Sequence, residues 1–226
     1  MPAMDVLFVH GAGREGAAAW PRQAAVAEPG WVFLPREGTA DDAARDAGRL
    51  LDLLRACGGG HVVAHSYGAN AAVPAAQLEP SVVRSLALLE PACFDLARGR
   101  PSVEEHIAAM TPVHAVADDA SVSAHEFSRR FAAAMGTPVP DLPAEELEAA
   151  VARLRALRLP WGVGVRPDVG LPVRTIVATG GWSPLYEETA AALVALGARH
   201  VTLDGAGHRV QDDPRVLPTL REHRDG

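Results

Sequence analysis

Short apolar runs of strand length alternate with helical patterns along most of the 226 residues, and this alternation constrains the fold more than any other feature. Runs typical of buried strands occur at 6–10, 31–35, 61–65, 82–90, 173–180 and 200–205. Helical patterns lie between several of them, at 41–60, 67–79 and 183–197. Strands that alternate with helices and are apolar throughout indicate a parallel sheet covered on both faces. The sequence therefore predicts an α/β fold with a mostly parallel central sheet of about six strands, flanked by helices.

About eighty residues separate the fourth predicted strand from the fifth, far more than an ordinary connection requires. Two amphipathic helical patterns lie in this segment, at 125–135 and 144–159. Helices inserted at this point can hardly avoid the carboxyl edge of the sheet, where open α/β sheets bind ligands. We therefore expect a helical cap at 95–170, inserted between the fourth and fifth predicted strands. The core then has two parts, 1–94 and 171–226.

Charge and cysteine usage exclude several classes of function. A net charge of −7 argues against nucleic-acid binding, which needs basic groups to neutralise phosphates. Cys57 and Cys93 form no CxxC pair, so two structural thiols in a reducing compartment are expected. Residues 1–13 lack the basic region of a signal peptide, and no apolar run is long enough to span a bilayer. We expect a soluble cytoplasmic protein, monomer or homodimer, that acts on a small molecule without nucleic-acid or membrane partners.

The stretch AHSYG at 64–68 has the pattern of a nucleophile elbow, a strained turn that exposes a serine between a buried strand and a helix. The positions two before and two after the serine must be small, because the backbone is crowded there. Ala64 and Gly68 occupy them. Glycine is usual at both, and alanine is the least disruptive departure. Ser66 is therefore a candidate nucleophile, with an ordinary loop serine as the alternative.

A glycine-rich loop follows the first predicted strand in FVHGAG, at 8–13. Such a loop can direct backbone N–H groups into a site and hold an oxyanion. It also contains a dinucleotide-type pattern, with glycines at Gly11, Gly13 and Gly16. A dinucleotide site also needs an acidic residue at the end of the second strand, where this chain has FLPREG and Glu37 lies only nearby. A nucleotide site is therefore a weaker interpretation of this loop than an oxyanion hole.

A histidine follows the last predicted strand in LDGAGH, at 203–208. His208 comes after the serine in the chain and in a loop beyond a strand, which suits a base that reaches back to Ser66. A surface histidine is the alternative. No cluster of histidine, cysteine or acidic residues has metal-ligand spacing, so we expect neither a metal nor a cofactor.

The motifs HGAG at 10–13, AHSYG at 64–68 and GAGH at 205–208 occur in the order found in α/β-hydrolase fold proteins. On these motifs the chain resembles the capped, esterase-like group of that family. The resemblance covers the sheet scaffold and leaves the cap unmatched.

This resemblance implies a role for each matching residue. It makes Ser66 the nucleophile and His208 the general base, and it makes the backbone N–H groups of Ala12 and Tyr67 the oxyanion hole. Serine is a poor nucleophile until a base takes its proton, and the tetrahedral intermediate needs donors for its negative oxygen.

The acid of the expected triad departs from the family pattern. Many members have a loop such as G-x-x-D after the strand before the last, whereas this chain has GGWS at 180–183. Ser183 cannot carry the negative charge that stabilises an imidazolium. Glu90 ends the strand that follows the elbow helix, at the correct edge of the sheet, and some α/β-hydrolases take their acid from this strand. We predict Glu90 as the acid, with Asp95 on the same loop, or no acid at all, as alternatives.

Several further side chains have ambiguous patterns. Asp212 and Asp213 lie near His208 in sequence but are predicted to cap the last helix. His65 and His114 are expected to pack or to face solvent, with substrate contact as the alternative. The aromatic residues predicted to contact substrate, each of which could equally be a core residue, are Trp20, Trp161, Trp182, Phe127 and Phe131.

These features predict a cofactor-free serine hydrolase, similar to carboxylic ester hydrolases. It would cleave an ester, thioester or lactone of a small, rather apolar substrate through an acyl-enzyme on Ser66. Two alternatives stand beside it. One is a lyase or cyclase on the same scaffold, with Ser66 and His208 as acid and base. The other is a ligand-binding or sensor protein with weak catalysis.

Overall fold

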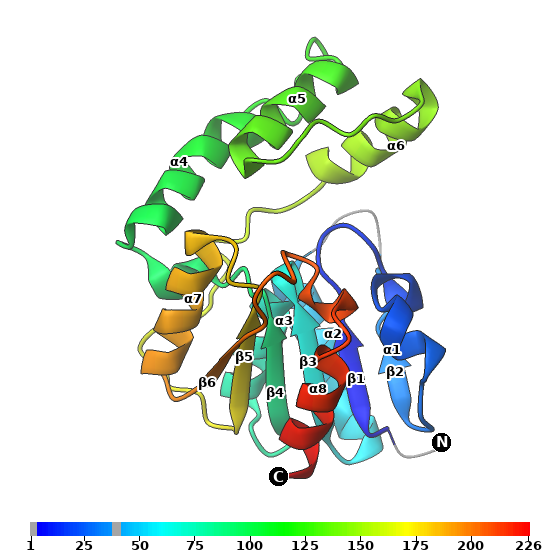
Figure 1. The fold of residues 1–226 in the computed structure, drawn as a ribbon, viewed down its shortest axis with the longest axis vertical. Helices are drawn as coiled ribbons and strands as arrows, with labels where there is room; N and C mark the ends of the chain where they lie inside the picture. Colours follow the sequence, from blue (N-terminus) through cyan, green and yellow to red (C-terminus); the bar gives the residue numbers. More distant parts are fainter. Residues whose placement is uncertain (1–3, 38–41) are drawn as a thin grey trace.

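The computed structural model describes residues 4–37 and 42–226 and contains a six-stranded parallel sheet (Figure 1). The strands are β1 (Val6–Val9), β2 (Trp31–Phe33), β3 (Gly60–His65), β4 (Val83–Leu89), β5 (Thr175–Thr179) and β6 (Arg199–Thr202). They lie in the order β2-β1-β3-β4-β5-β6. Each predicted run overlaps one of these strands, and the predicted α/β fold with a parallel sheet is confirmed.

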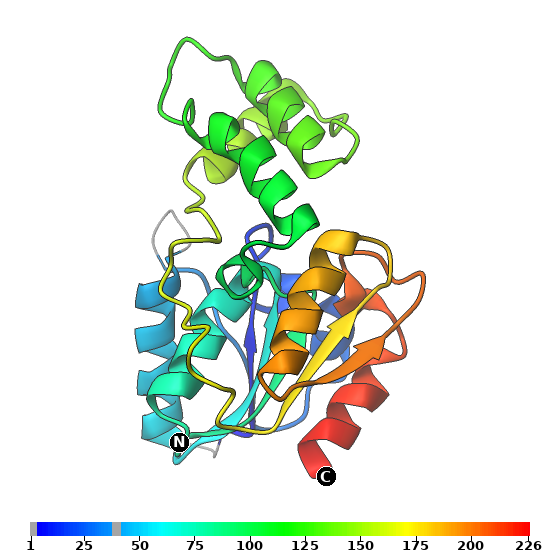
Figure 2. The same cartoon turned by 90° about the vertical axis from the view of Figure 1, so that its left-hand side faces the viewer.

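Helices cover both faces of the sheet (Figure 2). The flanking helices are α1 (Pro21–Ala25), α2 (Ala43–Cys57), α3 (Ala69–Leu78), α7 (Pro184–Ala195) and α8 (Val216–Asp225). On one face α2, α3 and α7 bury Leu50, Ala72 and Leu193 in one apolar cluster with the strands. On the other face, Trp20 and Leu220 belong to a second cluster, which joins the start of α1 and α8 to the sheet. The sheet is therefore buried on both sides, as its continuous apolar strands require.

Local signals at both ends define α2, which corresponds to the predicted helix at 41–60. Asp42 is its N-cap and accepts a hydrogen bond from the Arg45 N–H at 3.0 Å. Gly58 ends the helix in the left-handed conformation, with φ of 75°. Asp41, the first residue of the predicted segment, lies outside the described residues.

Three further helices lie between β4 and β5: α4 (Pro101–His114), α5 (Ala124–Met135) and α6 (Ala144–Arg155). We call them the helical insertion. Figure 1 shows them beyond the carboxyl ends of the strands, apart from the helices that cover the sheet. Val113, Phe127 and Val151 form a small buried cluster of their own among these helices. The assignment of 95–170 as a cap stays a prediction.

Two carboxylates bind the helical insertion to the core. Asp95 accepts hydrogen bonds from the backbone N–H groups of Gly162 at 2.9 Å and Val163 at 3.2 Å, where the chain returns to the sheet. Glu188, on α7, accepts from the N–H groups of Ser102 and Val103 in the first turn of α4. The second contact satisfies helix donors that have no partner inside α4.

The prediction that Asp212 caps the last helix is wrong, because its carboxylate pairs with Arg209 at 2.6 Å. The residue before α8 is Arg215, whose own side chain makes no capping bond. Asp213 accepts a hydrogen bond from the backbone N–H of Arg215 at 2.8 Å and also pairs with the Arg215 side chain at 2.8 Å. Asp213 thus satisfies one backbone donor at the start of the helix.

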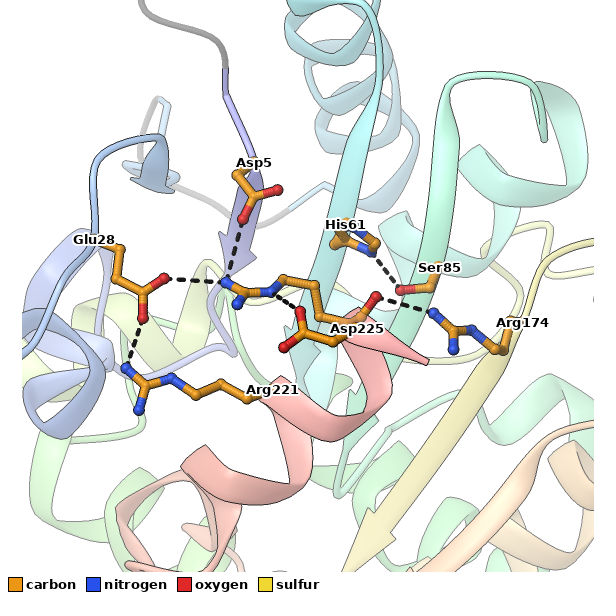
Figure 3. Close-up of polar contacts among 8 residues, drawn as sticks. Asp5, Glu28, His61, Ser85, Arg174, Arg221 and Asp225 are labelled. Atoms are coloured by element: carbon orange, nitrogen blue, oxygen red, sulfur yellow. Dashed lines mark hydrogen bonds and ion pairs between the residues drawn. The ribbon is translucent and has the colours of Figure 1, made fainter.

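A charged cluster joins α8 to the start of β1, at the amino ends of the strands (Figure 3). Arg224 lies 3.3 Å from Asp5 and 3.1 Å from Glu28, and Arg221 pairs with the other oxygen of Glu28 at 2.6 Å. Arg174 donates to the backbone oxygen of Arg224 at 3.1 Å. Hydrogen bonds from Arg221, and secondly from Arg224, lower the pKa of the Glu28 carboxyl. The cluster fastens the C-terminal helix to the edge of the sheet opposite the helical insertion.

Replacement of Arg224 by methionine should lower the free energy of unfolding by roughly 1 kcal/mol or less, because the cluster is partly exposed. The loss should be present at neutral pH and should shrink as pH falls through the lowered pKa of Glu28, where that carboxylate gains a proton. Urea unfolding at several pH values measures it. Arg129→Met, which removes an exposed pair within α5, is the matched control and should have a smaller effect. Equal effects of the two variants would contradict a joining role for the cluster.

Candidate active site

The turn that carries Ser66 is strained. Ser66 directly follows β3 and has φ of 51°, a conformation that residues with a side chain rarely adopt. A short 3-10 turn, Ser66–Gly68, leads from it into α3. A Cβ atom added to Gly68 would lie 2.5 Å from the His10 carbonyl oxygen, so only glycine fits there. The backbone of the first glycine-rich loop therefore approaches this turn closely.

That loop also lies directly against Ser66. A Cβ atom on Gly11 would lie 3.1 Å from the Cβ of Ser66. The loop is held by hydrogen bonds to its carbonyl groups: His10 Nδ1 donates to Gly11 O at 2.8 Å, and Arg36 donates to Ala12 O at 3.1 Å. In a planar trans peptide the N–H points away from the carbonyl. The bond from His10 therefore sets the direction of the Ala12 N–H as well.

Glu90 directly follows β4 and is fully buried, with φ of 44°. Its Oε2 lies 3.6 Å from Nδ1 of His208. The same carboxylate accepts two hydrogen bonds, from the Gly180 N–H to Oε1 at 2.6 Å and from the Trp182 indole N–H to Oε2 at 3.1 Å. These donors stabilise a charge that would otherwise be costly to bury.

The loop after β5, where the family pattern has its aspartate, supports Glu90 in this chain. A Cβ atom on Gly180 would lie 2.6 Å from the backbone oxygen of Gly207, so this loop packs on the one that carries His208. Trp182 reaches from the same loop to the Glu90 carboxylate. Ser183 is the N-cap of α7.

Packing on several sides orients the His208 ring. Tyr186 stacks on it with ring centroids 4.9 Å apart, and the His65 ring also lies 4.9 Å from it. His65 Nε2 donates to the backbone oxygen of His208 at 2.9 Å, which requires a proton on that nitrogen. Burial, and secondly the neighbouring His208, lower the pKa of His65 to about 3. His65 is therefore neutral at pH 7 and holds the His208 loop through a hydrogen bond.

The other acidic candidates have different partners. Asp95 binds backbone N–H groups where the chain returns from the helical insertion, and Asp212 and Asp213 pair with arginines. Among the acids considered from the sequence, Glu90 is the one that the structure brings to His208.

A cavity of about 350 Å³ lies between the elbow and the helical insertion. Its lining includes Ser66, His208, Ala12 and Tyr67, so the predicted nucleophile, base and oxyanion groups share one space. Apolar side chains of the helical insertion and of the segment after α6 form much of the remainder. From the insertion come Met110, Phe131, Met135 and Leu154, and from the segment after it Leu157 and Trp161. No aspartate or glutamate is among the described residues of this lining.

Two of the five aromatic residues predicted to bind substrate line this cavity, Phe131 and Trp161. The other three are absent from its lining. Trp20 is buried against Phe8 in the core, and Phe127 belongs to the core of the helical insertion. Trp182 donates its indole N–H to Glu90. The position of an aromatic residue near a motif in the sequence therefore did not predict whether its ring lines the cavity.

Four side chains line the cavity without having been assigned to the site from the sequence. His65 and His114, for which packing or solvent exposure was preferred to substrate contact, both line the cavity, and so does His106 on α4. Tyr186 on α7 lines it too and stacks on His208. The spacing of His106, Met110 and His114, four residues apart, was the available signal for one helix face.

The weaker alternatives find little support. The glycine-rich loop leads into a four-residue 3-10 helix, Gly16–Ala19, whereas a dinucleotide site has an α-helix N-terminus for the pyrophosphate. Glu37 pairs with Arg49 at 2.8 Å.

Within 4–37 and 42–226, no three histidine, cysteine or acidic residues are grouped as metal ligands would be. None of the helices in this part of the chain is both long and apolar enough to cross a membrane.

Comparisons with known proteins agree with this architecture. A model of the alpha/beta hydrolase family matches residues 6–217. Similar solved structures include epoxide hydrolase A from Mycobacterium thermoresistibile, with 20% identity, a TM-score of 0.67 and coverage of 97% of this chain and 90% of that chain. NosK from Streptomyces actuosus has 21% identity, a TM-score of 0.58 and coverage of 98% and 97%. A marine microorganism esterase has 14% identity, a TM-score of 0.61 and coverage of 98% and 95%. A search of curated protein sequences finds no match.

The close approach at the elbow can be tested with a pair of Gly→Ala variants. Gly68→Ala should lower the free energy of unfolding by about 1–3 kcal/mol, because the new methyl group meets the His10 carbonyl. Gly48→Ala, at an exposed position inside α2 with open space around it, should raise the free energy of unfolding by about 0.5–1 kcal/mol. Urea unfolding measures both. A neutral Gly68→Ala variant would show that the two loops do not touch.

Proposed function

Because the chain belongs to the alpha/beta hydrolase family, we propose that it is a serine hydrolase that uses Ser66, His208 and Glu90. One observation carries the proposal: a fully buried carboxylate, Glu90, lies 3.6 Å from Nδ1 of a histidine that shares a cavity with a strained serine. This combination is typical of nucleophilic catalysis at a carbonyl group. The reaction we propose is cleavage of an ester, thioester or lactone.

In the first half of the reaction, Ser66 Oγ attacks the carbonyl carbon of the substrate. His208 takes the serine proton and then gives it to the leaving oxygen or sulfur. The Glu90 carboxylate stabilises the imidazolium that forms between these transfers. Its position 3.6 Å from Nδ1 is longer than a strong hydrogen bond, as is common before substrate binds.

The tetrahedral intermediate carries a negative oxygen that needs hydrogen-bond donors. The N–H groups of Ala12 and Tyr67 are our candidates, since both residues line the cavity beside Ser66. The fixed Gly11 carbonyl supports this role for Ala12, because it turns the N–H of the same peptide away from His10.

In the second half, water attacks the acyl-enzyme, with His208 as the base that takes its proton. The acid is released and the serine proton is restored. Every step uses a group of the chain or water.

The walls of the cavity suggest the kind of acyl group it accepts. We propose that the helical insertion acts as a cap and binds an apolar acyl chain, because it contributes mainly apolar side chains to the lining. The absence of acidic residues from the described lining makes cationic substrates unfavourable.

Ser66→Ala should abolish labelling by a fluorophosphonate probe and lower kcat for short p-nitrophenyl esters by at least about 10³-fold. The alanine leaves no nucleophile for either reagent. Gel fluorescence and the release of p-nitrophenol measure the two effects. If the unmodified protein takes no label and cleaves no ester, thioester or lactone, the hydrolase proposal fails, and a lyase or binding role takes its place.

Glu90→Gln should lower kcat by roughly 10²- to 10⁴-fold with a smaller change in KM, because the amide cannot stabilise the His208 imidazolium. Asp95→Asn is the matched control. Asp95 bonds to backbone N–H groups at the return of the helical insertion, so this variant should retain most of kcat. Steady-state ester hydrolysis compares the two. If Asp95→Asn loses activity and Glu90→Gln keeps it, the acid assignment is overturned.

A further inference from the structure

One face of α4 presents two histidines to the cavity. His106, Met110 and His114 are four residues apart, and all three line the same space. They are close to one face of the helix because four residues are slightly more than one turn. The helical insertion thus contributes polar groups to a cavity that is otherwise largely apolar on this side.

His106 lies near the core end of α4. Its ring makes edge contacts with Phe94, at 5.1 Å between centroids, and with Trp161, at 6.2 Å. Phe94 belongs to the chain that follows Glu90, and its ring lies 6.4 Å from that of Tyr186, which stacks on His208. Aromatic neighbours therefore surround His106 close to the reacting groups.

His114 is the last residue of α4, eight residues beyond His106. At 1.5 Å per residue, it lies roughly 12 Å farther from the core along the helix axis. Figure 1 shows α4 leading away from the sheet in this direction. His114 is therefore on the part of the lining farther from the sheet than His106, whereas Ser66 directly follows β3.

The Nε2 atom of His114 is buried and has no hydrogen-bond partner among the described residues. Burial also lowers the pKa of this histidine, so the ring is neutral at pH 7. Apolar side chains of the same lining, including Phe131, Met135 and Leu154, come from the other two helices of the insertion. A buried ring nitrogen without a partner is unfavourable, and a ring rotation that turns Nε2 toward the cavity lets a ligand bond to it and removes that cost.

We propose that His114 forms a distal subsite that binds an uncharged hydroxyl group on the acyl chain of the substrate. This inference rests on the proposed function, since it places the scissile carbonyl at Ser66 and the hydroxyl at the far end. A neutral imidazole nitrogen is a donor in one tautomer and an acceptor in the other, and a hydroxyl group matches both. The charged side chains of the lining, Arg14 and Arg209, come from the loops that carry Ala12 and His208 and not from the helical insertion, so an ammonium group finds no anionic partner and a neutral imidazole offers a carboxylate a single bond.

The test compares p-nitrophenyl esters of straight acyl chains of about six, eight, ten and twelve carbons with their ω-hydroxy counterparts; the longer chains, fully extended, reach at least the roughly 12 Å by which His114 lies beyond His106 along α4. At the best length, the unmodified protein should prefer the hydroxy ester by at least about tenfold in kcat/KM. His114→Leu should remove or reverse this preference, and His114→Gln, which keeps a donor and an acceptor, should retain part of it. His125→Leu, at an exposed position on α5, is the matched control and should leave the preference unchanged.

Binding to the Ser66→Ala protein separates this inference from the proposed function. Calorimetry with methyl esters of the same two series measures the hydroxyl preference without turnover. Tighter binding of the hydroxy esters that is lost in Ser66→Ala/His114→Leu supports the subsite, even if the unmodified protein hydrolyses no ester. Equal binding of hydroxy and plain esters at every length overturns the subsite, even if hydrolysis is fast.

Discussion

The buried Glu90 carboxylate organises the carboxyl edge of the sheet. A charge removed from water must be paired or hydrogen-bonded, and here Gly180 and Trp182 after β5 donate the hydrogen bonds, while His208 after β6 lies 3.6 Å away. The segment after β4 carries the charge itself. Three loops that are distant in sequence are therefore held to one another by the need to satisfy a single anion. The orientation of His208 depends on that arrangement, and so does any chemistry it performs with Ser66.

The loops can meet at this carboxylate because their backbones approach without side chains between them. Gly180 packs on Gly207, Gly68 lies under His10, and Gly11 lies against Ser66. At each of these contacts a methyl group would enter space already occupied by another residue. The loop of HGAG at 10–13 thus packs on the turn of AHSYG at 64–68, and the loop of GGWS at 180–183 packs on that of GAGH at 205–208.

The strands, the elbow and the acidic residue beside His208 could be predicted because each depends on local sequence: apolar runs, small residues around a serine, and a glutamate at a strand end. The direction of a side chain could not. Trp182 and Phe127 were expected in the cavity, but tertiary packing directs the first toward Glu90 and the second into the core of the helical insertion. No helix was predicted around His114, and its position in the cavity lining follows from how α4 is placed relative to the sheet. Asp212 resembles a cap, yet Arg209 pairs with its carboxylate, whereas Asp213 does bond to a backbone N–H before α8.

The pair of bonds from Asp95 to Gly162 and Val163 has a consequence for how such a chain can vary. The bonds hold together the places where the polypeptide leaves the core and returns to it, and the contact of Glu188 with the first turn of α4 lies close to the same place in the chain. The length and shape of the helical insertion can change without moving the ends of β4 and β5 between which it lies. The helical insertion is therefore separable from the sheet edge that carries Ser66, Glu90 and His208. Chains that share this sheet and differ only in the helical insertion can then differ in the substrates they accept.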